Sequence, residues 1–241
     1  MQPVSVSIKL CDMVIRAVFC LLFLFSSIAS FASNDTSERD TGGHSPHYLD
    51  FTAGLLAYGS DPGYSLELSY AFFPVKYVGA SLGLEFTRML GSDGTYIDLL
   101  HDINEDDAKV MHFNLNPSVC FRSPILWFKG HESGLQLQVS PGAQLTMPKR
   151  SVVIDEHNGS GIVMRDYEIK CDNSRYVFWR VKSSVSWTDG QSHISLGYSM
   201  SNYDVYVFRR NLSFNGKKIF SDGRHKFLHT FFVSVGTTIF R

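Results

Sequence analysis

Residues 64–72 read YSLELSYAF, a stretch in which large apolar side chains alternate with small or polar ones. Successive side chains of a β-strand point to opposite faces, so a period of two predicts a strand with one apolar and one polar face. The apolar face carries Tyr64, Leu66, Leu68, Tyr70 and Phe72, and the other face carries Ser65, Glu67, Ser69 and Ala71. The stretch therefore predicts a sheet whose two surfaces differ in polarity.

The same alternation recurs along most of the chain after residue 46. The further segments that show it are residues 49–58, 78–87, 111–121, 135–145, 177–187, 193–201 and 230–239. Phe232 is an exception, because this large apolar side chain falls on the polar face of the last segment. The repeated pattern predicts an all-β protein of about eight strands.

The composition of the polar face indicates which surface meets water. This face consists mostly of Ser, Thr, Gly, Gln and Asn, and it holds few Lys or Glu. A soluble barrel or sandwich normally exposes many charged residues, whereas small polar residues suit the narrow interior of a membrane barrel. We therefore predict a single closed antiparallel transmembrane β-barrel with up-and-down topology. A soluble lipocalin-like barrel or a sandwich is the alternative.

The lengths of the connections favour the membrane barrel, in which short turns lie on one side and long loops on the other. On the predicted inner side lie the short turns 74–76 and 188–191 and a longer connection, 122–133. On the predicted outer side lie the short turn 59–63 and the long polar loops 91–108, 148–175 and 211–224. The three longest loops therefore all fall at one end.

The beginning of the chain has the order of a secretory signal peptide. A short apolar run, residues 17–25, follows the two basic residues Lys9 and Arg16, and small residues come after it. Cleavage is expected after Ala32, with Ala29 as the alternative. The predicted segments are a signal peptide at 1–32, a flexible lead-in at 33–46 and a barrel domain at 47–241. No later segment is apolar over the ~20 residues that a helical span needs, and we expect export to the bacterial outer membrane.

The end of the chain, residues 227–241, resembles the C-terminal strand of outer-membrane barrels, which usually closes on an aromatic residue. Here Phe240 is penultimate and Arg241 is last. Together with the alternation, this run makes residues 47–241 similar to the small, porin-like outer-membrane β-barrel proteins of bacteria. The resemblance implies outer-membrane lipid, lipopolysaccharide and the barrel-assembly machinery as partners, and it leaves the external ligand unknown.

Charge and cysteine content argue against several other classes of protein. The formal net charge is -1, so no broad basic field for nucleic acid is expected. Only Cys120 and Cys171 remain after removal of the signal peptide, too few for a zinc site of cysteines. The predicted topology places them at different heights, so we expect no disulfide between them. No phosphate-binding glycine motif occurs, and we predict no cofactor and no metal.

Charged and titratable side chains on the predicted inner face are the first candidate site. They are Asp50, Glu67, Glu85, His112, Arg180 and Lys182. A barrel of about eight strands is just wide enough to be filled by its own side chains. We therefore predict a charge network that closes the lumen, with a proton or ion path as the alternative.

His193 and Ser195 are a second candidate, because they resemble the His-x-Ser pair of outer-membrane lipid A deacylases. The resemblance implies a lipid-modifying activity. However, the alternation turns both side chains inward near the periplasmic end, and no acidic partner for the histidine is evident from the sequence. A hydroxyl without an adjacent base is not an activated nucleophile.

A third candidate is an acidic loop that contains Asp98, His101, Asp102, Glu105, Asp106 and Asp107. Clustered carboxylates can bind Ca²⁺ or a divalent ion that bridges lipopolysaccharide. The loop lacks the ligand spacing and central glycine of a calcium loop, so a solvated loop is expected.

From these features we predict a non-enzymatic barrel with a structural or surface-interaction role. The first alternative is a lipid-modifying enzyme of the lipid A deacylase or acyltransferase kind. The second is a narrow solute pore.

Overall fold

The computed structural model describes residues 47–90, 97–128, 133–147, 151–171, 175–189, 191–210, 212–219 and 225–239. The predicted signal peptide and lead-in, as well as Phe240 and Arg241, lie outside the described residues.

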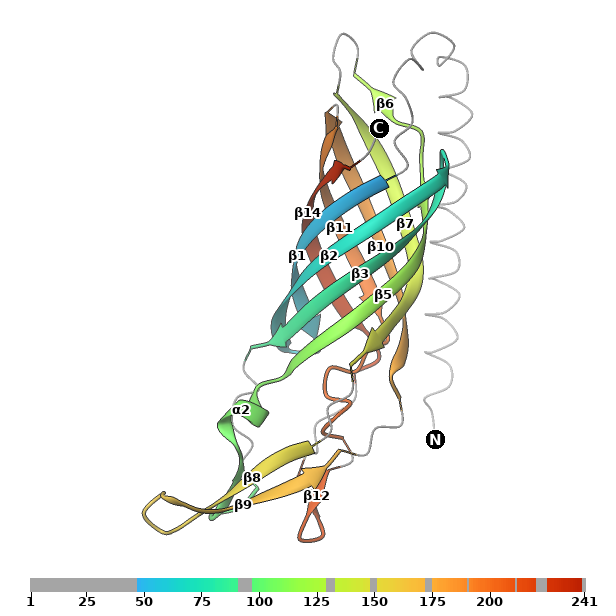
Figure 1. The fold of residues 1–241 in the computed structure, drawn as a ribbon. Helices are drawn as coiled ribbons and strands as arrows, with labels where there is room; N and C mark the ends of the chain where they lie inside the picture. Colours follow the sequence, from blue (N-terminus) through green and yellow to red (C-terminus); the bar gives the residue numbers. More distant parts are fainter. Residues whose placement is uncertain are drawn as a thin grey trace, which may run out of the picture.

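Eight long strands close into a barrel, which confirms the predicted fold (Figure 1). They are β1 (His47–Tyr58), β2 (Asp61–Val75), β3 (Val78–Met89), β5 (Met111–Arg122), β7 (Ser133–Thr146), β10 (Val177–Asp189), β11 (Ser192–Ser201) and β14 (Leu228–Thr238). Each pairs antiparallel with the next along the chain, and β14 pairs with β1, so the topology is up-and-down. A closed barrel leaves no free sheet edge in lipid.

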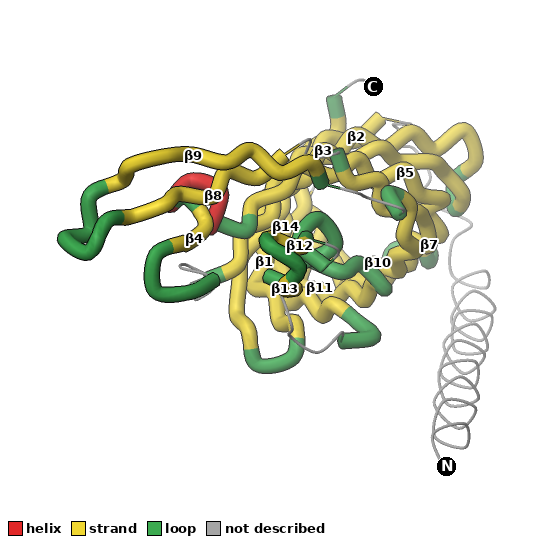
Figure 2. Tube along the Cα trace, turned by 90° about the horizontal axis from the view of Figure 1, so that it is seen from below, coloured by secondary structure: helices red, strands yellow, loops and turns green. Residues whose placement is uncertain are grey.

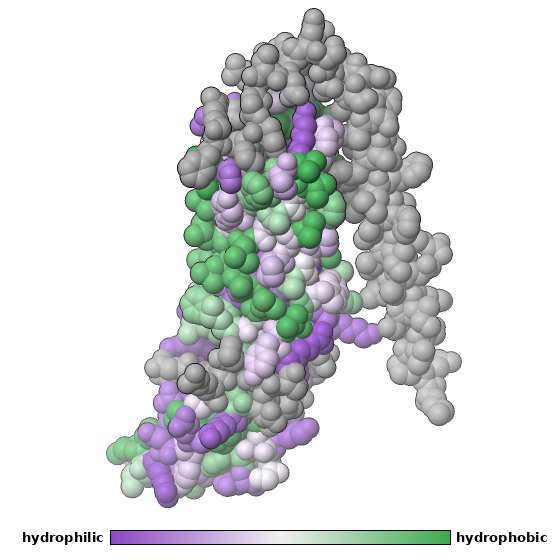
Figure 3. Space-filling view, turned by 45° about the vertical axis from the view of Figure 1, so that its right-hand side comes forward, coloured by the Kyte–Doolittle hydropathy of each residue, from purple (hydrophilic) through white to green (hydrophobic). Residues whose placement is uncertain are grey.

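The alternation of the sequence becomes the alternation of the two barrel surfaces. Outward side chains are large and apolar: Leu196 and Phe231 are each 64% exposed. Inward side chains are mostly small or polar and buried, as Ser199 and Asn114 illustrate. Figure 3 shows the resulting apolar surface on the barrel and a hydrophilic surface over the loops. The soluble alternative is therefore wrong, because the apolar face is the outer face.

The connections follow the predicted division into short turns and long loops. At the inner end, residues 76–77 and 190–191 join neighbouring strands, and the longer connection 123–132 carries β6 (Leu126–Trp127), which pairs with β7. At the outer end the tight turn 59–60 stands beside the three long loops. Among the described residues no helix has the length and apolar character of a membrane span, and the one short helix is α2 (Glu105–Ala108).

The long loops fold together at the outer end, which the sequence did not lead us to expect. Strands β4 (His101–Ile103), β8 (Ser151–His157) and β9 (Val163–Lys170) form one sheet from two different loops. The third loop adds a hairpin of β12 (Ser213–Phe214) and β13 (Lys217–Lys218). We call this unit, residues 97–108, 151–171 and 212–219, the outer platform.

The outer platform has a hydrophobic core of its own. Its buried members come from all three loops: Ile103, Ala108, Val152, Ile154, Leu212 and Ile219. In the view from the loop side, the β8–β9 hairpin projects beyond the ring of barrel strands (Figure 2). Because two of the loops share a sheet and all three share a core, they behave as one folded element rather than as separate solvated loops.

Candidate functional site

The lumen contains a buried charge network that joins opposite walls of the barrel. Arg180 on β10 donates two hydrogen bonds to the carboxylate of Glu67 on β2, at 3.1 and 2.9 Å. Lys182 donates to Glu67 at 3.1 Å, and Glu85 Oε1 lies 3.7 Å from Arg180 Nη2. Two carboxylates thus meet two cations, and paired groups are the form in which charges are tolerated away from water.

Neutral side chains complete the hydrogen bonding of this network. Asn116 and Gln144 both donate to Glu85 Oε2, at 3.1 and 3.2 Å. Lys182 also donates to Thr52 Oγ1 at 3.2 Å, and its Nζ lies 4.6 Å from the centre of the Phe232 ring. The inward position of Phe232, an exception to the sequence pattern, thereby supplies a cation–π contact.

Gly83 makes room for the Glu67 carboxylate. A Cβ atom at this position would lie 2.4 Å from Glu67 Oε1, closer than any tolerated contact. Gly83 is therefore part of the network, because a narrow barrel cannot hold a side chain on every inward residue.

The six charged or titratable residues expected in one network divide into three groups, which corrects the sequence-based picture. Glu67, Glu85, Arg180 and Lys182 come together as described. Asp50 is bonded instead to His193 Nε2 at 2.6 Å, nearer the inner end. His112 lies at the outer mouth, where its Nε2 is 2.8 Å from the carbonyl oxygen of Val205.

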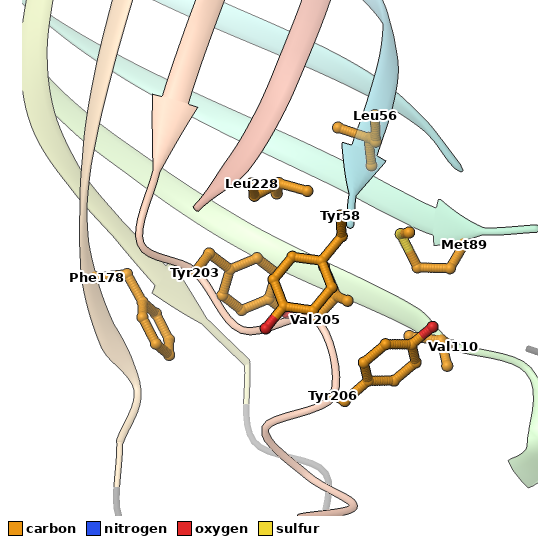
Figure 4. Packing of buried hydrophobic residues seen from close by; sticks show 9 residues of the cluster. All are labelled: Leu56, Tyr58, Met89, Val110, Phe178, Tyr203, Val205, Tyr206 and Leu228. Carbon is orange, nitrogen blue, oxygen red and sulfur yellow. The ribbon is translucent and has the colours of Figure 1, made fainter. Parts of the chain in front are cut away.

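The outer mouth is filled by residues 203–210, which we call the plug. Tyr203 and Val205 are fully buried there and pack with Tyr58 and Phe178 in one apolar cluster (Figure 4). Tyr203 also lies 3.2 Å from the Thr146 hydroxyl. The plug was not predicted, although the apolar residues of YDVYVF at 203–208 could have indicated burial.

Asp204 holds the plug in place. Its side chain is 3% exposed, accepts hydrogen bonds from the Tyr58 hydroxyl at 2.9 Å and from the Tyr206 amide at 3.1 Å, and is bonded to Arg210. A buried carboxylate needs such partners, because desolvation without them is costly. Asp204 therefore fixes the fold of the plug and attaches it to β1.

A chain of hydrogen bonds connects the plug to the charge network. The Tyr203 amide donates to Ser201 Oγ at 3.0 Å, and Ser201 donates to Gln144 Oε1 at 2.9 Å. Gln144 in turn donates to Glu85, as described above. A continuous chain of hydrogen bonds thus links the plug to the network in the loop-side half of the lumen.

The inner end of the lumen is covered by aromatic and cationic side chains. The Arg122 guanidinium lies 3.8 Å from the ring centre of Phe73 and 4.7 Å from that of Tyr48. Arg122 also donates to the Lys76 carbonyl oxygen at 2.9 Å. Inside this cover is a polar cavity of about 50 Å³, large enough for a few water molecules.

His193 and Ser195 both line that cavity. Asp50 gives His193 the acidic partner that sequence reasoning did not find. Ser195 is hydrogen-bonded to Ser186 at 2.7 Å, and the described residues show no bond between Ser195 and His193. The described geometry therefore contains an Asp–His pair without an attached nucleophile.

The carboxylates of the predicted acidic loop are used separately within the outer platform. Asp98 accepts hydrogen bonds from the amides of Leu100 and His101, which lower the pKa of its carboxyl. Asp102 bonds to His157 at 2.8 Å and raises the pKa of that imidazole. Asp107 accepts from the Val153 amide at 2.6 Å. Among the described residues no group of three or more potential ligands is arranged to hold a metal ion.

The closed eight-stranded barrel, with its apolar exterior and filled polar lumen, defines the class of the protein as a small barrel of the outer-membrane type. No family model matches the chain, and no curated protein matches it.

Solved structures with a similar fold include Neisserial surface protein A, with 13% identity, a TM-score of 0.40 and coverage of 82% of this chain and 99% of that chain. The outer membrane enzyme PagL follows with 10% identity, a TM-score of 0.38 and coverage of 79% and 99%. The attachment invasion locus protein Ail of Yersinia pestis has 9% identity, a TM-score of 0.35 and coverage of 79% and 95%. Similarity at this level does not bear on function, and the strand pairing alone defines the fold.

Proposed function

We propose that the protein is a non-enzymatic outer-membrane barrel that presents the outer platform at the cell surface. The observation that carries this proposal is the shared core of the three long loops, with Ile154 fully buried at its centre. A polar loop that only connects two strands needs no such core, whereas loops that present an interaction surface are held by a rigid scaffold. The lumen network serves as structural support for that scaffold.

The orientation and the closed lumen can be tested together on cells and in bilayers. Ser160, exposed in the β8–β9 turn, is changed to cysteine in a Cys171→Ser background, because Cys171 also lies in the outer platform, and is treated with a membrane-impermeant maleimide. We expect labelling of intact cells, and we expect the purified wild-type protein to give no single-channel steps in planar bilayers. Labelling of Ser160→Cys only after permeabilisation would contradict the orientation, and regular conductance steps would favour the narrow pore.

A lipid-modifying enzyme is the second candidate, favoured by the hydrogen bond between Asp50 and His193. The position of this pair inside the lumen argues against an enzyme, because a cavity of about 50 Å³ is too small to hold an acyl chain of a membrane lipid. Mass spectrometry of lipid A separates the two functions. The spectra are compared for cells with the wild-type gene, cells without it and cells that carry His193→Ala. Identical spectra are expected, and a wild-type spectrum that loses or gains an acyl chain in a His193-dependent manner would favour the enzyme.

A further inference from the structure

Strand β9 is an open edge of the outer platform. Its sheet has the order β4–β8–β9, so β8 pairs with one side of β9 and no described strand pairs with the other side. Figure 2 shows β9 along the outer margin of the projecting hairpin. An edge strand directs every second pair of backbone N–H and C=O groups away from the sheet, where a further strand can bind them. The edge of β9 is therefore a place at which an extended chain can be added.

The two faces of this sheet differ in charge. Residues directly opposite each other in paired strands share a face, and Ile103 opposite Ile154 lies on the face that covers the platform core. The alternation puts the neighbouring positions on the other face. There the register aligns Asp102 with Asp155 and Asp155 with Asp166, so three carboxylates lie side by side across the sheet. We call these three residues the aspartate row.

Positive charge is scarce along the aspartate row. Asp102 is bonded to His157, as described above. Asp155 Oδ2 accepts a hydrogen bond from Asn104 at 2.8 Å, whereas its Oδ1 is buried and has no hydrogen-bond partner among the described residues. Asp166 is exposed at the open edge, and its side chain forms no ion pair with a described residue. Like charges directly opposite each other in a sheet are unfavourable, so a cation beside Asp166 would stabilise the row.

A second copy of β9 does not fit this edge. In an antiparallel pair of identical strands the two core faces lie on the same side, so each residue lies opposite a residue of its own face. The two registers with the longest overlap then place Asp166 opposite either Asp166 or Glu168 of the second copy. Both registers bring carboxylates together, which is unfavourable. The charge of the edge therefore favours a different protein, with cations on this face.

We infer that the free edge of β9 binds an extended segment of another protein in which basic residues alternate with apolar residues. The basic side chains meet Asp166 and Glu168, which are exposed on the face of the aspartate row. The apolar side chains meet Tyr167 and Ile169, which are partly buried on the other face. Backbone hydrogen bonds supply affinity, and the alternation supplies specificity. The inference rests on the proposed function and names the class of partner that the outer platform would bind.

The test uses the full-length mature chain in phosphatidylcholine nanodiscs and two synthetic peptides. One peptide alternates lysine with valine, and the other alternates glutamate with valine. Affinity is measured by calorimetry, and the exchange of amide hydrogens is followed by mass spectrometry. We expect the wild type to prefer the lysine peptide. We also expect slower exchange in residues 163–170 when this peptide is bound, because an added strand forms hydrogen bonds with the edge.

Charge variants identify the edge as the binding site. Asp166→Lys should weaken binding of the lysine peptide about tenfold, because it replaces an attraction by a repulsion. Asp189→Lys is the matched control, since this exposed residue lies at the inner end of β10 and its substitution changes the net charge equally. The control should bind like the wild type. Asp166→Asn should have an intermediate affinity and keeps the test decisive if Asp166→Lys does not fold.

Equal affinity of the wild type for both peptides, equal losses in Asp166→Lys and Asp189→Lys, or binding without slower exchange in β9 would overturn the inference. Dimerisation of the peptide-free chain that protects residues 163–170 would overturn it in favour of a second copy. Surface labelling of Ser160→Cys is measured in parallel. A chain that is labelled on intact cells but binds no peptide sinks only this inference, whereas absence of labelling sinks the proposed function as well.

Discussion

Single residues in the lumen show how far local sequence patterns reach. The period of two placed Glu67 and Arg180 on the inner face, because the direction of a side chain depends only on its own strand. A charge network among the inward residues was predicted, but the partner that each residue takes could not be, since β2 and β10 become opposite walls only when the barrel closes. Asp50 was assigned to the wrong group for the same reason.

At this scale we predict that Glu67→Gln strongly destabilises the barrel. The substitution leaves Arg180 and Lys182 with one carboxylate fewer, and breaking a buried pair costs about 3–5 kcal/mol. The free energy of unfolding is measured by urea titration in lipid vesicles. Glu168→Gln on the exposed strand β9 is the control, with an expected change within about 0.5 kcal/mol. Equal losses for both variants would mean that the network does not stabilise the fold.

A second residue prediction concerns pH and the outer platform. The hydrogen bond to Asp102 raises the pKa of His157 above its ordinary value near 6.5. A raised pKa means that the bond stabilises the platform fully below that ordinary value and that the stabilisation is lost as pH rises through the folded pKa. Trypsin should therefore cleave the platform faster at pH 8 than at pH 6.

His157→Gln is the matched control for this pH dependence. The glutamine of the variant does not titrate in this range. Its platform should therefore be cleaved at the same rate at pH 6 and at pH 8, after correction for the activity of trypsin on an unfolded substrate. A wild type with no pH dependence between these values would contradict the role given to His157.

At the scale of elements, the strands were predictable and the outer platform was not. Each barrel strand carries its own alternation, and each pairs with its neighbour along the chain. The core of the platform instead contains residues that are far apart in the sequence, such as Ile103, Ile154 and Ile219. A periodic pattern within one segment does not predict contacts between distant segments. The plug is a contiguous segment whose apolar residues at 203–208 could have indicated burial, but its position in the barrel mouth depends on contacts with distant strands.

The apolar outer face of the strands gives a direct comparison of two exposed residues. Leu84 is 48% exposed in the middle of β3, and Ile162 is 62% exposed on the platform. In a membrane barrel Leu84→Arg should cost about 2–4 kcal/mol, because arginine meets the bilayer core. Ile162→Arg should cost almost nothing, since that residue meets water. Unfolding titrations in lipid vesicles that gave equal losses would contradict the membrane placement of β3.

The outer platform should unfold without the barrel. Ile154→Asp puts a carboxylate into the fully buried centre of the platform core, where it has no partner. We expect rapid trypsin cleavage after Arg165 and Lys170, while the barrel keeps its compact form in detergent. Val163→Asp, at an exposed position of the same sheet, is the control and should resist cleavage. Loss of the barrel in Ile154→Asp would show that the two parts fold as one.

At the scale of the whole molecule, closure is the property on which the account depends. Strand β14 returns to β1 across the full length of the described chain, with partners such as Phe51 and Val235 in register. Closure removes the sheet edges, sets the two surfaces apart and brings the two carboxylates and two cations of the network together. A sheet that failed to close would expose unpaired backbone groups to lipid.

The migration of the mature chain on denaturing gels tests closure most directly. The protein is refolded into detergent micelles and loaded with and without boiling. We predict that the unboiled sample migrates as a compact species and that boiling shifts it to the mobility of the unfolded chain, because a closed barrel has no fraying edge for the detergent to open. Identical migration of the boiled and unboiled samples would contradict the closed membrane barrel.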